Sequence, residues 1–327
     1  MRRASLTILL LAAALVAAIF AAVLLGSERL PFYETICNLL GGNCELTAEQ
    51  TAILFEIRLP RVLLGACVGA ALATAGASYQ SLLRNPLAEP YLLGVSNGAA
   101  LGTMLALVYL NNVFFARPFL AFVGATFSTL VVYSLARSRA GMNTERLVLA
   151  GVIVTTFLSS LIVLMTSLLD AARLRSYTFW LLGDLSNATK DSLWFVLAAV
   201  AVGLILLLSQ ARALNLLMLG ERDAFDFGVE VGRVRLIVFL TASALVGSSV
   251  AASGSVGYVG LVVPHIVRLS SGSDNRLVIP ASALAGAIFV TFADTIARTA
   301  IAPRELPVGA ITALIGAPLF IFLLRRN

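Results

Sequence analysis

Nine stretches of the chain contain no Asp, Glu, Lys or Arg and consist mainly of apolar side chains. Eight of them are 17 to 26 residues long, and about 20 apolar residues cross a bilayer as a helix. The pattern therefore predicts membrane-spanning helices. The eight runs are Leu6–Leu25, Val62–Leu83, Tyr91–Ala116, Pro118–Ala136, Leu147–Leu169, Ser192–Ala211, Leu277–Ala293 and Leu306–Leu324. The first is too long for the apolar region of a signal peptide.

The ninth run, Leu236–Val267, is 32 residues long and needs a different interpretation. As one helix it would measure about 48 Å at a rise of 1.5 Å per residue, which exceeds a hydrocarbon core of about 30 Å. It contains the sequence GSVGYVG, Gly254–Gly260, whose three glycines favour a break. We expect two helices here, the second one short. The fold class is then all-α, with ten transmembrane helices in a single domain, residues 1–327.

The distribution of basic residues gives the orientation. With the N-terminus inside, 14 of the 23 Lys and Arg residues lie in inner segments and nine lie outside. If Leu236–Val267 were one helix, the count would be twelve against eleven. Because cytoplasmic loops carry an excess of Lys and Arg, we expect ten spans with both termini cytoplasmic.

Composition narrows the class of protein further. The chain is 59% hydrophobic and 12% charged, with a mean hydropathy of +0.95, as expected for a membrane protein. Its basic residues are scattered, which argues against nucleic-acid binding. Three cysteines without a C-x-x-C motif and one histidine, His265, do not predict a metal site. Cys37 and Cys44 in a predicted outer loop form either a disulfide or two free thiols.

One polar segment, Leu82–Gly102, is unusual in so apolar a chain. Pro86 and Pro90 prevent a continuous helix, and Asn85 can bond freed backbone groups. Three glycines at i, i+4 and i+8 would let the following helix approach a neighbour closely; they are Gly94, Gly98 and Gly102. The segment is either a rigid corner or a moving part.

The longest inner loop, Ala211–Arg235, is a candidate docking surface. The sequence contains no G-x-x-x-x-G-K-[ST] phosphate-binding motif, so ATP-driven transport would need a separate ATPase. We expect one short helix ending near Gly220 and a second from about Arg222 to Gly228 or Gly232. Such a helix pair could insert into a groove on a partner; the alternative is a helix lying on lipid headgroups.

Six motifs occur in an order that resembles one family. They are RLPR (Arg58–Arg61), NPLAEP (Asn85–Pro90), LGVSNGA (Leu93–Ala99), LGERDA (Leu219–Ala224), GYVGLVVPHIVR (Gly257–Arg268) and ELPVGAITALIGAPLFIFLL (Glu305–Leu324). Together they resemble the FecCD-type permeases of bacterial importers for iron–siderophores, haem and cobalamin, including the vitamin B12 permeases. The resemblance implies a dimer of ten-helix subunits, two ATP-binding-cassette ATPase subunits below it, and a periplasmic or lipid-anchored substrate-binding protein above it.

The resemblance also implies roles for particular residues. Asn85 and Leu87 would form a cytoplasmic gate. Arg58, Arg61 and Arg298 would dock the binding protein; the alternatives are headgroup anchoring or, for Arg298, an i,i+4 pair with Asp294. ATPase docking would use Leu219, Gly220, Glu221, Arg222 and Ala224. The small residues Gly69, Ala73 and Gly76 share one helix face, which would either line the pathway or pack closely against another helix.

The resulting functional hypothesis is an importer permease of the bacterial inner membrane. It works by alternating access as a homodimer, without an ATP site, cofactor or enzymatic activity of its own. LRSYTFWLLGDLS, Leu174–Ser186, resembles the iron and haem branches, so we expect an iron chelate; cobalamin is the alternative. An ATPase-independent carrier is a further alternative, although the acidic residues lie almost wholly at segment ends rather than at a midplane ion site.

Overall fold

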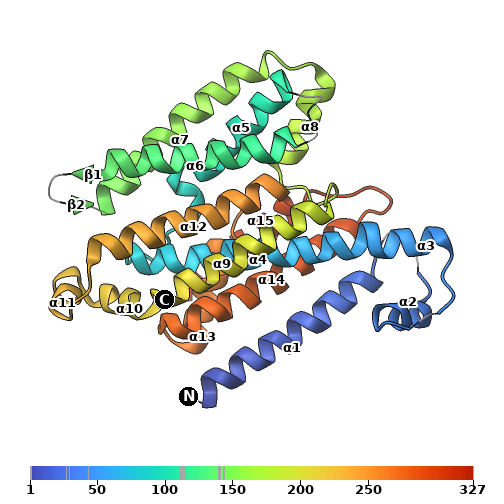
Figure 1. Cartoon of the computed structure of the whole chain (residues 1–327), viewed down its shortest axis with the longest axis horizontal. Helices are drawn as coiled ribbons and strands as arrows, with labels where there is room; N and C mark the ends of the chain where they lie inside the picture. Colours follow the sequence, from blue (N-terminus) through green and yellow to red (C-terminus); the bar gives the residue numbers. More distant parts are fainter. Residues whose placement is uncertain are drawn as a thin grey trace.

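The computed structural model describes residues 2–26, 28, 30–42, 44–110, 113, 115–138, 141–142 and 144–326. Within them the chain is almost entirely helical (Figure 1). The long helices are α1 (Arg2–Leu24), α4 (Leu59–Leu82), α5 (Val95–Tyr109), α6 (Ala116–Ala136), α7 (Thr144–Thr166), α9 (Lys190–Ser209), α12 (Val231–Ser253), α13 (Val259–Ser271), α14 (Asn275–Thr299) and α15 (Val308–Arg326).

Shorter elements join these helices. They are α2 (Phe32–Leu39), α3 (Ala48–Ala52), the π-helical turn η1 (Ile53–Arg58), the 3₁₀ turn η2 (Pro90–Leu93), α8 (Ala171–Leu181), α10 (Ala211–Leu219), α11 (Glu221–Asp226), and a two-stranded hairpin, β1 (Arg137–Ser138) and β2 (Gly141–Met142). In the hairpin Arg137 pairs with Met142. The hairpin and α8 were not expected from the sequence.

A helix lies at each of the ten predicted spans, but not all ten are long enough to cross a membrane on their own. Within the described residues, seven helical segments are long and apolar enough to cross a membrane, and α5, α13 and α15 are shorter apolar helices. The helices run back and forth along the long axis (Figure 1). Hairpin β1–β2, α10, α11 and both chain termini lie at one end, here called the α11 end. The opposite, α2 end carries α2, α3 and α8.

The predicted division of Leu236–Val267 is confirmed. Helix α12 ends at Ser253, and α13 begins at Val259 and has 13 residues. The intervening Gly254 has φ +67°, a left-handed conformation that favours glycine. A Cβ at Gly254 would lie 1.9 Å from the carbonyl oxygen of Trp180, so the close approach of the last turn of α8 also requires glycine there.

The prediction of one helix over Tyr91–Ala116 is wrong. The segment contains η2 and the shorter α5, and Gly94 between them has φ +79°. Gly94 therefore joins η2 to α5 in a left-handed backbone conformation. The prediction that Gly94 lets the helix approach a neighbour closely is wrong, because a Cβ there would make only ordinary contacts of 3.5 Å or more. The same prediction is confirmed for the other two glycines: Cβ atoms at Gly98 and Gly102 would lie 2.3 and 1.9 Å from backbone oxygens of α6.

Local capping explains where several helices begin. Thr47 and Gln50 form a capping box at the start of α3, from which the helical path continues through η1 into α4. The second span therefore starts earlier than Val62. Thr189 and Ser192 cap α9 in the same way, and the Asp274 carboxylate accepts a hydrogen bond at the start of α14.

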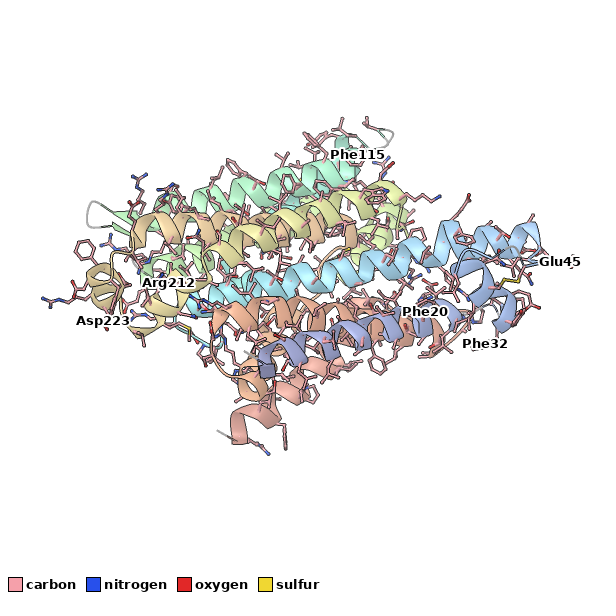
Figure 2. All side chains as sticks on the ribbon, turned by 60° about the horizontal axis from the view of Figure 1, so that its bottom comes forward. Phe20, Phe32, Glu45, Phe115, Arg212 and Asp223 are labelled. Carbon is pink, nitrogen blue, oxygen red and sulfur yellow. A yellow bond between two sulfur atoms is a disulfide. The ribbon has the colours of Figure 1, made fainter. Side chains whose placement is uncertain are left out.

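The loop at the α2 end is closed by a disulfide between Cys37 and Cys44. This is one of the two alternatives left open by the sequence. Figure 2 shows Phe32 and Glu45 in this loop, at the end opposite Arg212 and Asp223.

Candidate functional site

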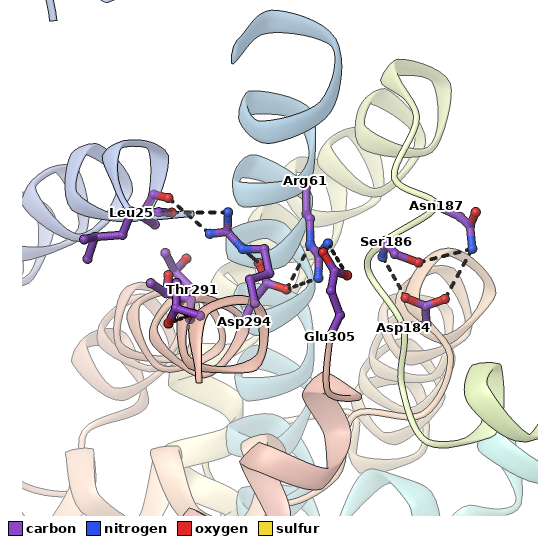
Figure 3. Close-up of polar contacts among 12 residues, drawn as sticks. Leu25, Arg61, Asp184, Ser186, Asn187, Thr291, Asp294 and Glu305 are labelled. Carbon is purple, nitrogen blue, oxygen red and sulfur yellow. Dashed lines mark hydrogen bonds and ion pairs between the residues drawn. The ribbon is translucent and has the colours of Figure 1, made fainter. Parts of the chain in front are cut away.

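Four charged side chains form a network at the α2 end. Arg61 of α4 lies 3.0 Å from Asp294 of α14 and 2.8 Å from Glu305, in the segment before α15. The other oxygen of Asp294 lies 3.0 Å from Nε of Arg298, one helical turn further along α14. Figure 3 shows the Asp294 carboxylate and the Glu305 side chain beside the guanidinium group of Arg61. One carboxylate thus joins α4 to α14 and contacts two buried cations, and Glu305 supplies the second negative charge of the network.

The same end of the molecule fixes the last turn of α1. Arg298 donates to the carbonyl oxygens of Ala22 and Leu25, at 3.1 and 3.5 Å. Arg58 donates to the carbonyl of Val23 at 3.1 Å and to that of Glu28. The last carbonyls of a helix have no partner within the helix, and cations near them are favourable. These two arginines therefore attach α1 to α4 and α14.

The three arginines expected to dock a binding protein are thus already engaged inside the chain. Arg58, Arg61 and Arg298 are 4, 6 and 4% exposed. The i,i+4 pair of Arg298 with Asp294, the alternative drawn from the sequence, is present. Docking by these residues remains a prediction, and it would require them to exchange internal partners for those of the binding protein.

A cavity of about 930 Å³ lies between α6, α8, the start of α9 and the end of α12. Its lining combines two guanidinium groups with two carboxylates and three aromatic rings, from Arg117, Arg175, Asp184, Asp191, Phe115, Phe179 and Trp180. The guanidinium carbon of Arg175 lies 5.8 Å from the ring centre of Phe179. Such a lining can contact both the anionic groups and the flat apolar surfaces of a ligand. Nothing in the sequence pattern indicated this cavity.

The predicted gate residues lie at the α11 end, directly after α4. The Asn85 side-chain oxygen accepts the Leu87 backbone N–H at 2.9 Å, forming the expected local turn. Leu87 is 44% exposed. The preceding residue, Arg84, has φ +50°, a conformation uncommon for a residue with a side chain. The turn is therefore well defined, and its role as a gate remains a prediction.

The segment that follows is bonded to the break between α12 and α13. The Tyr91 hydroxyl donates to the carbonyl of Val256 at 2.9 Å and accepts the N–H of the same residue at 3.1 Å. Glu89 accepts the N–H of Tyr258 at 3.3 Å, and Tyr258 has φ +66°. Two non-helical stretches, far apart in sequence, therefore satisfy each other's backbone groups. Sequence reasoning missed this contact.

The docking loop contains the two short helices that the sequence predicted. Helix α10 ends at Leu219 before Gly220, whose φ is +156°, and α11 spans Glu221–Asp226. Leu219 and Phe225 are 69 and 72% exposed. The loop therefore presents apolar side chains next to charged ones, as a protein-docking surface does.

Individual docking residues differ in position. Arg222 is exposed, whereas Ala224 is fully buried and packs inside the loop. Glu221 forms an ion pair with Arg235 of α12 and lies 3.8 Å from Arg84. Because Arg84 directly precedes Asn85, the structure brings the predicted docking loop next to the predicted gate.

The predicted pathway face of α4 is filled by other helices. A Cβ at Gly69 would lie 2.1 Å from the oxygen of Gly286 on α14, and one at Gly76 would lie 1.9 Å from that of Gly260 on α13. Ala73 is fully buried and contacts the Gly286 position. The structure thus shows the close-packing alternative, and lining of a pathway by these residues stays a prediction for another conformation.

No group of three or more potential metal ligands occurs among the described residues. The ring of His265 lies 6.0 Å from that of Phe320, and its Nε2 is buried without a hydrogen-bond partner in the described part of the chain.

Comparison with known proteins identifies the family to which the chain belongs. A model of the FecCD transport family matches residues 14–326. The chain belongs to the FecCD transport family. It is 40% identical to the hemin transport system permease protein HmuU of Yersinia pestis over 84% of each chain. It is 41% identical to the vitamin B12 import system permease protein BtuC of Vibrio cholerae, over 85% of this chain and 84% of that one.

Two further matches agree with this membership. The cobalamin import system permease protein BtuC of Halobacterium salinarum is 42% identical, over 84% of this chain and 73% of the relative. A solved inward-facing metal-chelate-type ABC transporter superimposes with a TM-score of 0.87 at 30% identity, covering 98% of this chain and 99% of that one. This FecCD protein is therefore a membrane-spanning ABC importer permease, and its relatives are named for both haem and cobalamin.

Proposed function

We propose that this FecCD protein is the permease subunit of an importer that moves an iron chelate, a siderophore or haem, across a bacterial inner membrane. It has ten spans and cytoplasmic termini, and it works as a homodimer with two ATP-binding-cassette ATPases and a substrate-binding protein. The observation that carries the proposal is the family match over residues 14–326, to which the likeness to a metal-chelate-type transporter adds support.

The arrangement of the chain ends supports the topology. Both termini, α10 and α11 lie at one end, and the disulfide loop lies at the other (Figures 1 and 2). Disulfides persist in oxidising compartments such as the periplasm, which fits an external α2 end. An even number of spans then returns the chain to the cytoplasm.

Coupling to the ATPase is proposed to occur through α10 and α11. ATP-driven movement of the ATPase subunits would push on this loop. Its Glu221 lies beside Arg84, next to the gate residues Asn85 and Leu87. Displacement of the loop therefore has a short route to the end of α4, where the alternating opening and closing would occur.

The cavity at the α2 end supports a partly aromatic cargo whose polar groups can meet both cations and anions, because Asp184 and Asp191 line it beside the two arginines. Arg117 and Arg175 suit carboxylate or catecholate groups, and the three aromatic rings suit a flat ligand. A volume of about 930 Å³ is near the upper end of the range for small-molecule sites, about 300–1,000 Å³. Haem or a siderophore suits it better than the larger cobalamin, which remains the second candidate because several relatives are named for it.

The proposal is tested by purifying the tagged permease from its native membrane and identifying the associated proteins. An ABC ATPase should co-purify, and the complex in liposomes should import a ferric siderophore or haem only with ATP and the binding protein. Import without ATP would favour an independent carrier, and preferential import of cobalamin would change the cargo. Gly220→Leu should reduce ATPase co-purification; unchanged assembly and uptake would show that the loop is not the docking surface.

A further inference from the structure

A cluster of polar side chains lies beneath the docking loop, where α4, α10, α13 and α14 meet. Its centre is Asn275, the first residue of α14, which is fully buried. The surrounding side chains come from residues up to 194 positions away in sequence. No motif placed them together. Asn215 lies in α10 of the docking loop, but none of these residues is among the individual docking or gate residues proposed from the sequence.

The side chain of Asn275 joins three other helices. Its oxygen accepts from the Arg268 guanidinium of α13 at 3.0 Å and lies 2.7 Å from the Ser81 hydroxyl of α4. Its nitrogen donates to the Asn215 oxygen of α10 at 2.9 Å. A guanidinium can only donate, so the amide oxygen must face Arg268 and the amide nitrogen must face α10. The orientation of the amide is therefore fixed by its neighbours.

The remaining hydrogen-bonding groups of the cluster are also paired. The backbone N–H of Asn275 donates to Asn215 at 2.8 Å, and the Asn215 nitrogen donates to Asp274 at 2.6 Å. Arg268 also donates to the Ser81 hydroxyl at 2.6 Å and to the Ala77 carbonyl at 3.0 Å. The network is buried at Asn275 and Ser81, half-buried at Asn215 and Arg268 and exposed at Asp274. A polar network whose members are paired around a buried centre favours one arrangement.

The network leads directly to the gate segment. Ser81 lies in the last turn of α4, and its carbonyl accepts the N–H of Arg84 at 3.3 Å. The N–H of Asn85 donates to the carbonyl of Gln80 at 3.1 Å. The Gln80 side chain in turn donates to the carbonyl of Leu261 on α13 at 3.1 Å. A shift of α4 at Ser81 therefore shifts the backbone that carries Asn85.

A second connection between the docking loop and the gate is weaker. The Glu221–Arg84 pair is separated by 3.8 Å, and both side chains are nearly half exposed. Exposed ion pairs hold their geometry poorly and are screened by salt. The connection through half-buried Asn215 and fully buried Asn275 is better suited to transmit a displacement of α10.

We propose that Asn215 and Asn275 are positioning residues that transmit movement of α10 to the inner end of α4 and thus to the gate. This inference rests on the proposed function. Asn215 bonds the docking helix α10 to Asn275. Asn275 in turn is bonded to Ser81 of α4 and Arg268 of α13. Without the connection, ATP hydrolysis and gate movement become uncoupled even though the ATPase still binds.

The test uses the complete transporter, with ATPase and binding protein, in liposomes. Asn215→Ala removes the two hydrogen bonds from Asn275 to α10 that end on the Asn215 oxygen. It leaves the weaker contact of the Asn275 nitrogen with the Met218 sulfur at 3.5 Å and the Asn275 bonds to Ser81 and Arg268 in place. Asn275→Asp keeps the acceptor oxygens and removes the donor to Asn215. Ser270→Ala is the matched control, because that exposed hydroxyl bonds only within its own part of α13. Uptake, ATP hydrolysis and ATPase content are measured on each preparation.

We expect Asn215→Ala and Asn275→Asp to assemble and hydrolyse ATP, with cargo imported per ATP falling about fivefold to tenfold, while Ser270→Ala matches the wild type. Unchanged import per ATP would overturn the inference, as would a loss of uptake that follows the loss of assembled complex, since that indicates a structural role only. If the wild type itself neither binds an ATPase nor imports cargo, the proposed function fails first and this inference fails with it.

Discussion

Replacing Asp294 with Asn tests whether the arginines at the α2 end hold the molecule together. The carboxylate is 2% exposed and contacts Arg61 and Arg298, whose side chains are 7 and 5% exposed. Two unit charges about 4 Å apart attract by about 4 kcal/mol at an effective dielectric constant of about 20, and two such contacts are lost. A neutral amide costs less to bury than a carboxylate, which offsets part of the loss.

The expected net result for Asp294→Asn is a loss of about 3–5 kcal/mol of unfolding free energy, as for other broken buried ion pairs. Arg61 and Arg298 would also then repel each other. The matched control is Glu305→Gln, because Glu305 is 39% exposed and a pair with an exposed partner contributes about 0.2–1 kcal/mol.

The assay is equilibrium unfolding of the purified permease in mixed detergent micelles, followed by the fluorescence of its two tryptophans. Affinity for the binding protein is measured on the same preparations. If Asp294→Asn costs no more than Glu305→Gln, the reasoning about the buried network is wrong. If Arg61→Ala lowers the affinity while stability is retained, Arg61 acts in docking rather than inside the chain.

Three further predictions concern packing, topology and pH. Gly98→Leu places atoms where a Cβ would already lie 2.3 Å from a backbone oxygen of α6, so it should cost about 1–3 kcal/mol in the same unfolding assay. Gly257→Ala, with open space around it, should be tolerated; equal losses would contradict the close-contact argument. In intact cells, a membrane-impermeant maleimide should label Cys37 and Cys44 only after reduction, and no labelling would contradict an external α2 end. Burial alone would raise the pKa of Asp274, but hydrogen bonds from the Arg276 N–H and the Asn215 amide, with the Arg276 charge, lower it overall. The ionised Asp274 carboxylate therefore stabilises the fold above its unfolded pKa of about 3.9, and this stabilisation is lost as the pH falls through the lower pKa of the folded state. Asp274→Asn, which keeps a capping side chain but does not titrate, should not lose stability over that pH range.

The sequence predicted the ends of helices correctly where neighbouring residues, chiefly glycines, determine them. The glycines between Gly254 and Gly260 predicted the break between α12 and α13, and Gly220 predicted the end of α10. The pattern failed over Tyr91–Ala116, because an uncharged run does not reveal that Gly94 adopts a left-handed conformation. It also missed α8, whose N-cap Asp170 follows an apolar run without any periodic signal.

Partners distant in sequence could not be predicted from the residues. Arg61 was singled out, but Asp294 and Glu305 are 233 and 244 positions away. A resemblance to a family suggests that a residue matters, and it does not say which contact the residue makes within its own chain. For the same reason, Asn275 drew no attention: a single Asn at a helix start is common, and only the fold surrounds it with three other helices.

These contacts together identify the part of the molecule that moves as one unit. Helices α4 and α14 are joined at three levels: Arg61 with Asp294 at one end, Gly69 against Gly286 in the middle, and Ser81 with Asn275 at the other end. Sliding one helix along the other would break the ion pair, separate two backbones that only glycine allows to touch, and break a buried hydrogen bond. Such a movement is costly at every level. Arg268 also bonds α13 to Ser81 of α4 and Asn275 of α14. The displacement that opens and closes the path should therefore occur between this group of three helices and the helices beyond the break at Gly94, where the backbone is already non-helical.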